Sequence, residues 1–196
     1  MFNDISAIIV AGGQDKTFGV QKLYFSHKRK LLWEYQYDFL IDIVPQVIIC
    51  GLDSDPKATR LESLAEALRL VNTRRVLVLD LEQIFLTHKD LEIICSKKKP
   101  SVTLCKKSEA NMFCKSSLSF IETDSYLNII PVQLFDTSLI KNCIYNNITR
   151  IKNKNTKDFC SVLQKYANIV PELVYADSSS AKRLVDRTDI KFLNTL

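Results

Sequence analysis

Short apolar runs alternate with amphipathic segments along most of this chain. The clearest run is Arg75–Asp80, which is apolar until an acid at its end, and Ser6–Ala11 is a second, closed by glycine. Such runs, bounded by turn residues, are typical of buried strands. Between them, Arg60–Val71 has the spacing of a helix with one apolar face. The alternation predicts an α/β domain with a mostly parallel sheet.

The same reasoning places the other elements. Further helices are expected at Leu31–Val44, Thr87–Ser96, Asp136–Asn146, Thr156–Ala167 and Asp186–Leu193. Further strands are expected at Gln46–Cys50, Pro100–Cys105 and Leu173–Ala176. Residues 108–130 are less regular and are expected to form a protruding, short-stranded arm. Because no repeat or flexible linker divides the sequence, we expect one domain over residues 1–196.

Composition narrows the classes of partner. The net charge of +5 is mild, so it suits anionic small substrates without requiring nucleic acid. No run of apolar residues is long enough to span a membrane, and the first residues do not resemble a signal peptide. The six cysteines include no C-x-x-C pair and several lie in apolar runs, which favours reduced, buried thiols. We therefore expect a cytoplasmic protein with neither nucleic acid nor membrane as partner.

Two features follow the predicted strands at their carboxyl ends, where ligands bind in parallel α/β sheets. The first is the Gly12-Gly13 pair after the first strand. Glycines allow backbone N–H groups to approach phosphate oxygens, although a plain turn after a strand has the same pattern. The second is Asp80, which could bind a divalent metal or a ribose hydroxyl, or cap the next turn.

Six sequence motifs in one order make the pattern more specific. The first is Ala11-Gly12-Gly13 followed by Gly19 and Lys22; the others are 59–64, 76–85, 132–135, 156–158, and Lys182 followed by Asp189-Ile190. This order resembles the cytidylyltransferases of the methylerythritol-phosphate and ribitol-phosphate type, over nearly the whole chain. The stretch Cys160–Tyr166 is more similar to the animal ribitol-phosphate enzymes than to the bacterial ones.

The resemblance implies a Rossmann-like nucleotidyltransferase fold and a reaction. CTP and Mg²⁺ would bind, a phosphate oxygen of a sugar-alcohol phosphate would attack the α-phosphorus, and pyrophosphate would leave. D-Ribitol 5-phosphate is the favoured acceptor over 2-C-methyl-D-erythritol 4-phosphate. Members of the family commonly dimerise through an arm in the place of residues 108–130, so a homodimer is expected, although a monomeric flap fits the same composition.

The resemblance also assigns roles to particular residues. Lys22 would contact the α-phosphate, Lys182 would be a second phosphate-side lysine, and Asp80 would lie near the ribose and the magnesium ion. As a loop residue, Lys22 is expected to be exposed and to contribute little to stability. The other substrate-binding residues would be Ala11, Gly12 and Gly13 under the triphosphate, Ser63 at the cytosine, and Gln133 in a segment similar to T-P-Q-x-F.

The chain departs from the family pattern at the positions that would carry positive charge. Thr17 stands in place of the loop arginine, Asp15 in place of a glycine, and Gln83 in place of a second arginine. Lys16, next to Asp15, is the residue that could replace the missing charge. Three hypotheses follow: an active, diverged cytidylyltransferase; a catalytically impaired homologue that binds a nucleotide or a partner; and a different nucleotidyltransferase or nucleotide-sugar enzyme of the same fold class.

Overall fold

The structure is a computed structural model. It describes residues 1–11, 22–54, 57, 59–107, 112–114, 119–121, 126–156, 158–176, 182–184 and 189–193. Gly12, Gly13, Asp15, Lys16 and Thr17 lie outside the described residues.

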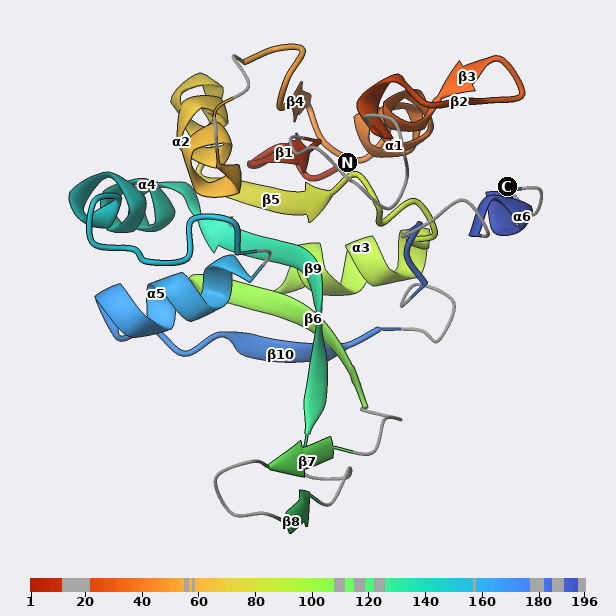
Figure 1. The fold of residues 1–196 in the computed structure, drawn as a ribbon. Helices are drawn as coiled ribbons and strands as arrows, with labels where there is room; N and C mark the ends of the chain where they lie inside the picture. Colours follow the sequence, from red (N-terminus) through yellow and green to blue (C-terminus); the bar gives the residue numbers. More distant parts are fainter. Residues whose placement is uncertain are drawn as a thin grey trace.

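A six-stranded sheet runs through the middle of the molecule in the order β10-β6-β9-β5-β1-β4 (Figure 1). Its strands are β1 (Ile5–Val10), β4 (Gln46–Ile49), β5 (Arg75–Asp80), β6 (Ser101–Lys107), β9 (Leu127–Asp136) and β10 (Glu172–Tyr175). The pairs β1/β4, β1/β5 and β6/β10 are parallel, whereas β9 is antiparallel to both β5 and β6. The mostly parallel α/β fold predicted from the sequence is therefore confirmed.

Helices cover both faces of the sheet, so its strands are buried on both sides. On one face, α1 (Leu32–Ile41) and α3 (His88–Ser96) pack in one apolar cluster. On the other face, α2 (Arg60–Leu70), α4 (Thr137–Asn147) and α5 (Phe159–Ala167) form a second cluster. A short helix, α6 (Ile190–Leu193), lies near the C-terminus (Figure 1).

Small elements complete the fold. A 3₁₀ turn, η1 (Lys22–Tyr24), precedes the hairpin of β2 (Ser26–His27) and β3 (Lys30–Leu31). A second hairpin, β7 (Met112–Cys114) and β8 (Ser119–Ile121), projects beyond the ends of β6 and β9 (Figure 1). The predicted protruding arm is thus present as a hairpin, but it ends earlier in the chain than residue 130.

Local sequence sets where most helices begin. An N-terminal cap satisfies a backbone N–H that has no partner inside the helix, and its loss typically costs about 1 kcal/mol. In four of the helices the capping side chain accepts a hydrogen bond from a backbone N–H in the first turn. These caps are Thr59, Thr87, Asp136 and Asp158.

The strand β9 is the main element that the sequence analysis missed. The sequence predicts an arm for its first residues, 127–130, and only a motif, with no strand, for residues 132–135. Pro131 makes this strand hard to recognise in the sequence, because proline is rarely found in a central strand. The pairing of β6 with β9 shifts register between Thr103 and Leu104, and this irregularity accommodates a residue that has no N–H to donate.

The prediction of reduced, buried thiols is confirmed for five of the cysteines. Cys50, Cys95, Cys105, Cys143 and Cys160 are buried free thiols, as the sequence suggested. Of the helices in the described ranges, none combines the length and the apolarity needed to cross a membrane.

Candidate active site

The carboxyl ends of β1 and β5 meet at one edge of the sheet. Val10, the last residue of β1, is in register with Asp80, the last residue of β5. The N–H of Leu81 continues the pairing by donating to the carbonyl oxygen of Val10 at 3.2 Å. Ala11 and the residues after Asp80 therefore leave the sheet side by side. Parallel α/β sheets bind their ligands at this position, beyond the carboxyl ends of the strands.

A buried ion pair lies at this edge. The Nζ of Lys22 donates to the Oε1 of Glu82 at 3.0 Å, and the two side chains are only 7% and 14% exposed. Arg183 approaches the other carboxylate oxygen of Glu82, with Nη1 4.0 Å from Oε2. One carboxylate thus faces two cations from segments far apart in the sequence. Lys22 is not the exposed loop residue expected from the sequence, because it begins the turn η1 and its side chain is buried against Glu82, just after β5.

A second buried ion pair lies beside the first. Arg60, the first residue of α2, donates through Nη2 to the Oδ1 of Asp80, and the side chains are 13% and 4% exposed. Burial lowers the pKa of the Arg60 guanidinium, and the nearby Glu82 carboxylate opposes that shift. The Nε2 of Gln36, from α1, donates to the backbone carbonyl of Asp80 at 2.9 Å and holds the strand end in place.

These contacts bring together three cations and two carboxylates within the described part of the site. The cations are Lys22, Arg60 and Arg183, and the carboxylates are those of Asp80 and Glu82. A cluster with this excess of positive charge, partly withdrawn from water, favours an anionic ligand, because charges interact more strongly where water is scarce.

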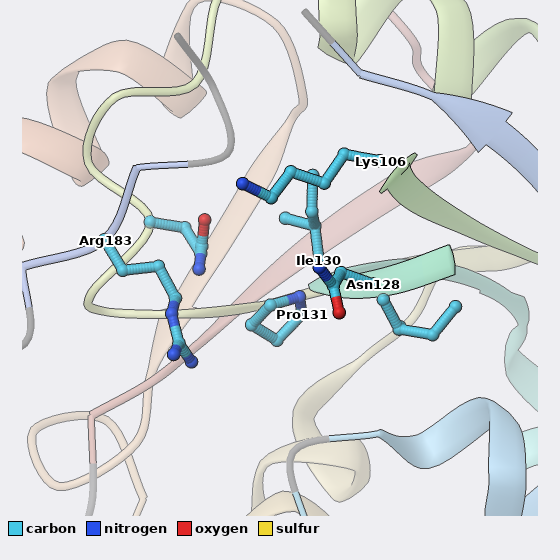
Figure 2. A pocket seen from close by; sticks show the side chains of 7 residues that line it. Lys106, Asn128, Ile130, Pro131 and Arg183 are labelled. Carbon is cyan, nitrogen blue, oxygen red and sulfur yellow. The ribbon is translucent and has the colours of Figure 1, made fainter. Parts of the chain in front are cut away.

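A pocket of about 360 Å³ opens next to the cluster (Figure 2). Lys106 extends into it from β6 and Arg183 from the other side, with Pro131 and Asn128 of β9 along its wall (Figure 2). Gln83 also lines the pocket and is 1% exposed. Neither polar atom of its carboxamide has a hydrogen-bond partner among the described residues. Buried amides normally find a partner, so this side chain is suited to bind a polar group of a ligand.

The structure brings together several of the predicted site residues. Ala11, Lys22 and Asp80 lie at the shared strand edge. Lys182 is exposed and directly precedes Arg183, in a segment anchored by the N–H of Leu184, which donates to the carbonyl oxygen of Glu82 at 3.1 Å. The roles of these residues toward a substrate stay predictions.

Two predicted substrate-binding residues make hydrogen bonds within the protein. The Oγ of Ser63, which is buried in α2, accepts a hydrogen bond from the N–H of Lys57 at 3.1 Å. The carboxamide of Gln133 joins β9 to the start of α5, donating to Asp158 Oδ1 and accepting from the N–H of Phe159, each at 2.9 Å. Contact of either residue with a substrate remains a prediction.

Sequence reasoning missed Arg60, Glu82 and Arg183 as site residues, although each stands within or next to a motif. Arg60 lies in the 59–64 motif, Glu82 is two residues after Asp80, and Arg183 follows Lys182. Glu82 follows shortly after an apolar run and Arg60 follows the Thr59 helix cap, whereas Arg183 has no signal of its own beyond its place next to Lys182. Which of these charges pair with each other depends on the packing of distant segments.

The carboxylate groups near the shared end of β1 and β5 are compatible with a magnesium ion carried by a nucleotide. Magnesium binds one or two carboxylates together with phosphate oxygens and water. Asp80 and Glu82 could supply carboxylate oxygens here, each of them now paired with a cation. Within the described ranges, no group of three or more histidine, cysteine or acidic side chains is arranged to hold a metal ion by itself.

Comparison with solved structures identifies the fold. The chain superposes on 2-C-methyl-D-erythritol 4-phosphate cytidylyltransferase from Thermus thermophilus with a TM-score of 0.80 at 15% identity, over 98% of both chains. The 4-diphosphocytidyl-2C-methyl-D-erythritol synthase of Anaerococcus prevotii gives a TM-score of 0.79 at 20% identity, over 100% of this chain and 98% of that one.

The chain has the fold of these cytidylyltransferases. The Francisella tularensis enzyme of the same name as the first gives a TM-score of 0.74 at 16% identity, over 98% of this chain and 99% of that one. No family model and no curated protein matches the sequence. The whole-length superposition agrees with the order of motifs in the sequence, while the particular likeness to animal ribitol-phosphate enzymes gains no support from these structures.

Proposed function

We propose that this protein is a cytidylyltransferase that transfers CMP from CTP to a sugar-alcohol phosphate. The observation that supports it is the cluster of Lys22, Arg60 and Arg183 at the shared end of β1 and β5. The predicted glycine loop follows β1 directly at this point, and the fold is that of enzymes with this reaction.

In the proposed mechanism, a phosphate oxygen of the acceptor attacks the α-phosphorus of CTP. A new P–O bond forms as the bond to the β-phosphate breaks, and pyrophosphate leaves with that electron pair. Lys22 would stabilise the charge that develops on the α-phosphate, and Lys182 would bind on the phosphate side. Magnesium, when bound with the nucleotide, would neutralise phosphate charge, with Asp80 as its protein ligand.

The acceptor would occupy the pocket beside the cluster. Lys106 and Arg183 can bind its phosphate, and the carboxamide of Gln83, which has no partner among the described residues, can bind a hydroxyl group. The sequence resemblance predicts D-ribitol 5-phosphate, whereas the Thermus thermophilus and Francisella tularensis enzymes compared above are named for 2-C-methyl-D-erythritol 4-phosphate. Both compounds belong in the assay.

The test is pyrophosphate release from CTP and Mg²⁺, measured with each acceptor separately. We expect release with one of the two acceptors, formation of the matching CDP-alcohol, and none with CTP alone. Lys22→Met should reduce turnover at least 100-fold, roughly the usual scale for losing one preorganised charge contact. Lys89→Met, at an exposed position of α3, is the matched control and should act like the wild type. Equal turnover in both variants would contradict the assignment of Lys22.

A second candidate function is a nucleotide-binding or partner-binding protein that has lost catalysis. It is favoured by Glu82, which already pairs with the proposed catalytic lysine, and by Gln83 in place of an arginine. Under this hypothesis CTP binds, but no acceptor yields pyrophosphate. Binding without turnover would therefore support the second candidate against the first.

The hairpin of β7 and β8 is also the proposed dimer contact. It projects away from the sheet, as an element exchanged between two copies would. Sedimentation velocity of the full chain should give the mass of a dimer. A variant lacking residues 109–124 should sediment as a monomer, and a full-length chain that is itself monomeric would contradict the proposal.

A further inference from the structure

The carboxylate of Glu82 occupies a position that suits an anionic ligand. Its two oxygens face two cations, the ammonium of Lys22 at 3.0 Å and the guanidinium of Arg183 at 4.0 Å. A phosphate group is commonly held in this way, by cations converging from separate segments. We propose that Glu82 is a built-in counter-ion which a polyphosphate ligand must displace, so that it sets which anions the site accepts.

The backbone around Glu82 is fixed, which leaves the side chain as the part that can move. The carbonyl oxygen of Glu82 accepts from the N–H of Leu184 at 3.1 Å. The next N–H, that of Gln83, donates to the carbonyl oxygen of Asp80 at 3.0 Å. Rotation about the side-chain bonds of Glu82 can therefore release Lys22 without disturbing the strand end. The side chain is 14% exposed, so water and a ligand can reach it.

The pairing has a consequence for selectivity. A monophosphate carries about 1.5 to 2 negative charges at neutral pH, all on one phosphorus, so it gains little charge over the carboxylate that it displaces, and the loss of the existing ion pair offsets that gain. A di- or triphosphate carries more charge and more oxygens, so it can bind Lys22 and Arg183 together after the carboxylate has left. The site would then discriminate against monophosphates and inorganic phosphate, and require a polyphosphate.

That the displacing ligand is a nucleotide rests on the proposed function, whereas the displacement itself does not. Inorganic pyrophosphate is therefore the first probe, because it carries the polyphosphate charge without a base. Its affinity is measured by calorimetry for the wild type and for Glu82→Gln. Glu92→Gln, which removes the same charge from an exposed position on α3, is the matched control.

We expect Glu82→Gln to bind pyrophosphate at least tenfold more tightly than the wild type, and Glu92→Gln to differ from it less than twofold. The gain for inorganic phosphate should be larger than the gain for pyrophosphate, because the monophosphate competes less well with the carboxylate. Should Glu82→Gln fail to fold, Glu82→Asp keeps the charge but shortens the reach, and it should give an intermediate gain.

Two other results would overturn the proposal, and a third would separate it from the proposed function. Unchanged or weaker binding of pyrophosphate by the Glu82 variants would overturn the proposal, because Glu82 would then hold Lys22 in place for the ligand instead of competing with it. A gain of similar size in Glu92→Gln would also overturn it, since the effect would be one of net charge alone. If pyrophosphate binding improves as expected while no form binds CTP, the counter-ion role of Glu82 stands and the proposed function fails.

Discussion

Arg60 and Asp80 form a buried ion pair between the first turn of α2 and the last residue of β5. The guanidinium is 13% exposed and the carboxylate 4%. The pair joins a helix on one face of the sheet to the strand end where the proposed nucleotide site lies. Asp80 therefore has a structural role as well as any role toward a ligand.

Replacement of Asp80 by asparagine should destabilise the protein without any ligand present. The change keeps the size of the side chain but leaves the buried guanidinium of Arg60 facing a neutral amide. Breaking one partner of a buried pair costs about 3–5 kcal/mol. Thermal unfolding of the ligand-free chain should show the loss. Asp38→Asn is the control, because its pair with Lys30 is exposed and should change stability by less than about 1 kcal/mol.

This expectation differs from the sequence analysis, which places Asp80 near a ligand and indicates no buried ion pair for it. The difference arises from Arg60, whose guanidinium reaches Asp80 from another element. If the melting temperature of Asp80→Asn equals that of the wild type, the buried pair is not formed in solution.

The pair of Lys22 and Glu82 can be measured by a double-mutant cycle. Lys22→Met and Glu82→Gln should each lower the free energy of unfolding, because each leaves a largely buried charge with a weaker partner. The double variant should be more stable than the sum of the two losses predicts, with a coupling of about 1–3 kcal/mol. Denaturant titration of the four proteins gives the value. Additive losses would show that the two side chains do not interact.

The buried thiols predict a loss of stability in alkali. Burial raises the pKa of Cys50, Cys95 and Cys160 to about 12, from an ordinary value of 9.0. Above pH 9 the unfolded chain loses these protons while the folded chain keeps them, so the unfolded state becomes more favourable. Stability should be unaffected by these groups below pH 9 and fall as the pH rises toward 12.

The slope of that fall gives the test. Each thiol contributes up to about 1.4 kcal/mol per pH unit in this window. Cys160→Ala should therefore show a shallower alkaline loss than the wild type, although the substitution itself lowers stability at neutral pH. Identical alkaline slopes in the two proteins would contradict the burial of Cys160.

At the opposite edge of the sheet, Asp4 joins the starts of β1 and β5. The Nε and Nη2 of Arg75 donate to its two carboxylate oxygens at 3.0 and 3.2 Å. These hydrogen bonds lower the pKa of the Asp4 carboxyl below its ordinary 3.8, with partial burial opposing and Arg74 adding to the effect. The contribution to stability is therefore present above pH 3.8 and is lost as the pH falls below it.

Asp4→Asn should lower stability at pH 7 by up to about 1 kcal/mol, a modest value because the carboxylate is 42% exposed. Below pH 4, the variant should lose less additional stability than the wild type. Unfolding followed between pH 7 and pH 3 checks both expectations. A variant that loses as much as the wild type in acid would show that Asp4 does not titrate with a lowered pKa.

The sequence predicts the fold well because most strands are continuous apolar runs closed by turn residues. Arg75–Asp80 is the best example, and the helix that begins at Arg60 is marked by its Thr59 cap. The strand β9 was missed because Asn128 and Pro131 interrupt its pattern, and only the register shift opposite β6 makes room for the proline. That compensation involves a partner strand and is invisible in the β9 sequence itself.

The candidate site was predictable in its location but not in its pairing. The rule that ligands bind at the carboxyl ends of parallel strands points to the Gly12-Gly13 pair and Asp80, and the family resemblance adds Lys22. Neither indicates that Glu82 would pair with Lys22, or that Arg60 would reach Asp80 from a helix. Such contacts depend on side chains from segments up to 60 residues apart, such as the hydrogen bond from Lys22 to Glu82.

Calorimetric titration of the wild-type chain with CTP and Mg²⁺ tests the central claim most directly. The account predicts saturable binding of one CTP per chain, weakened at least tenfold by Lys22→Met and unchanged by the exposed control Lys89→Met. Absence of CTP binding at millimolar concentration, or equal binding by the wild type and Lys22→Met, would contradict a nucleotide site at the shared end of β1 and β5.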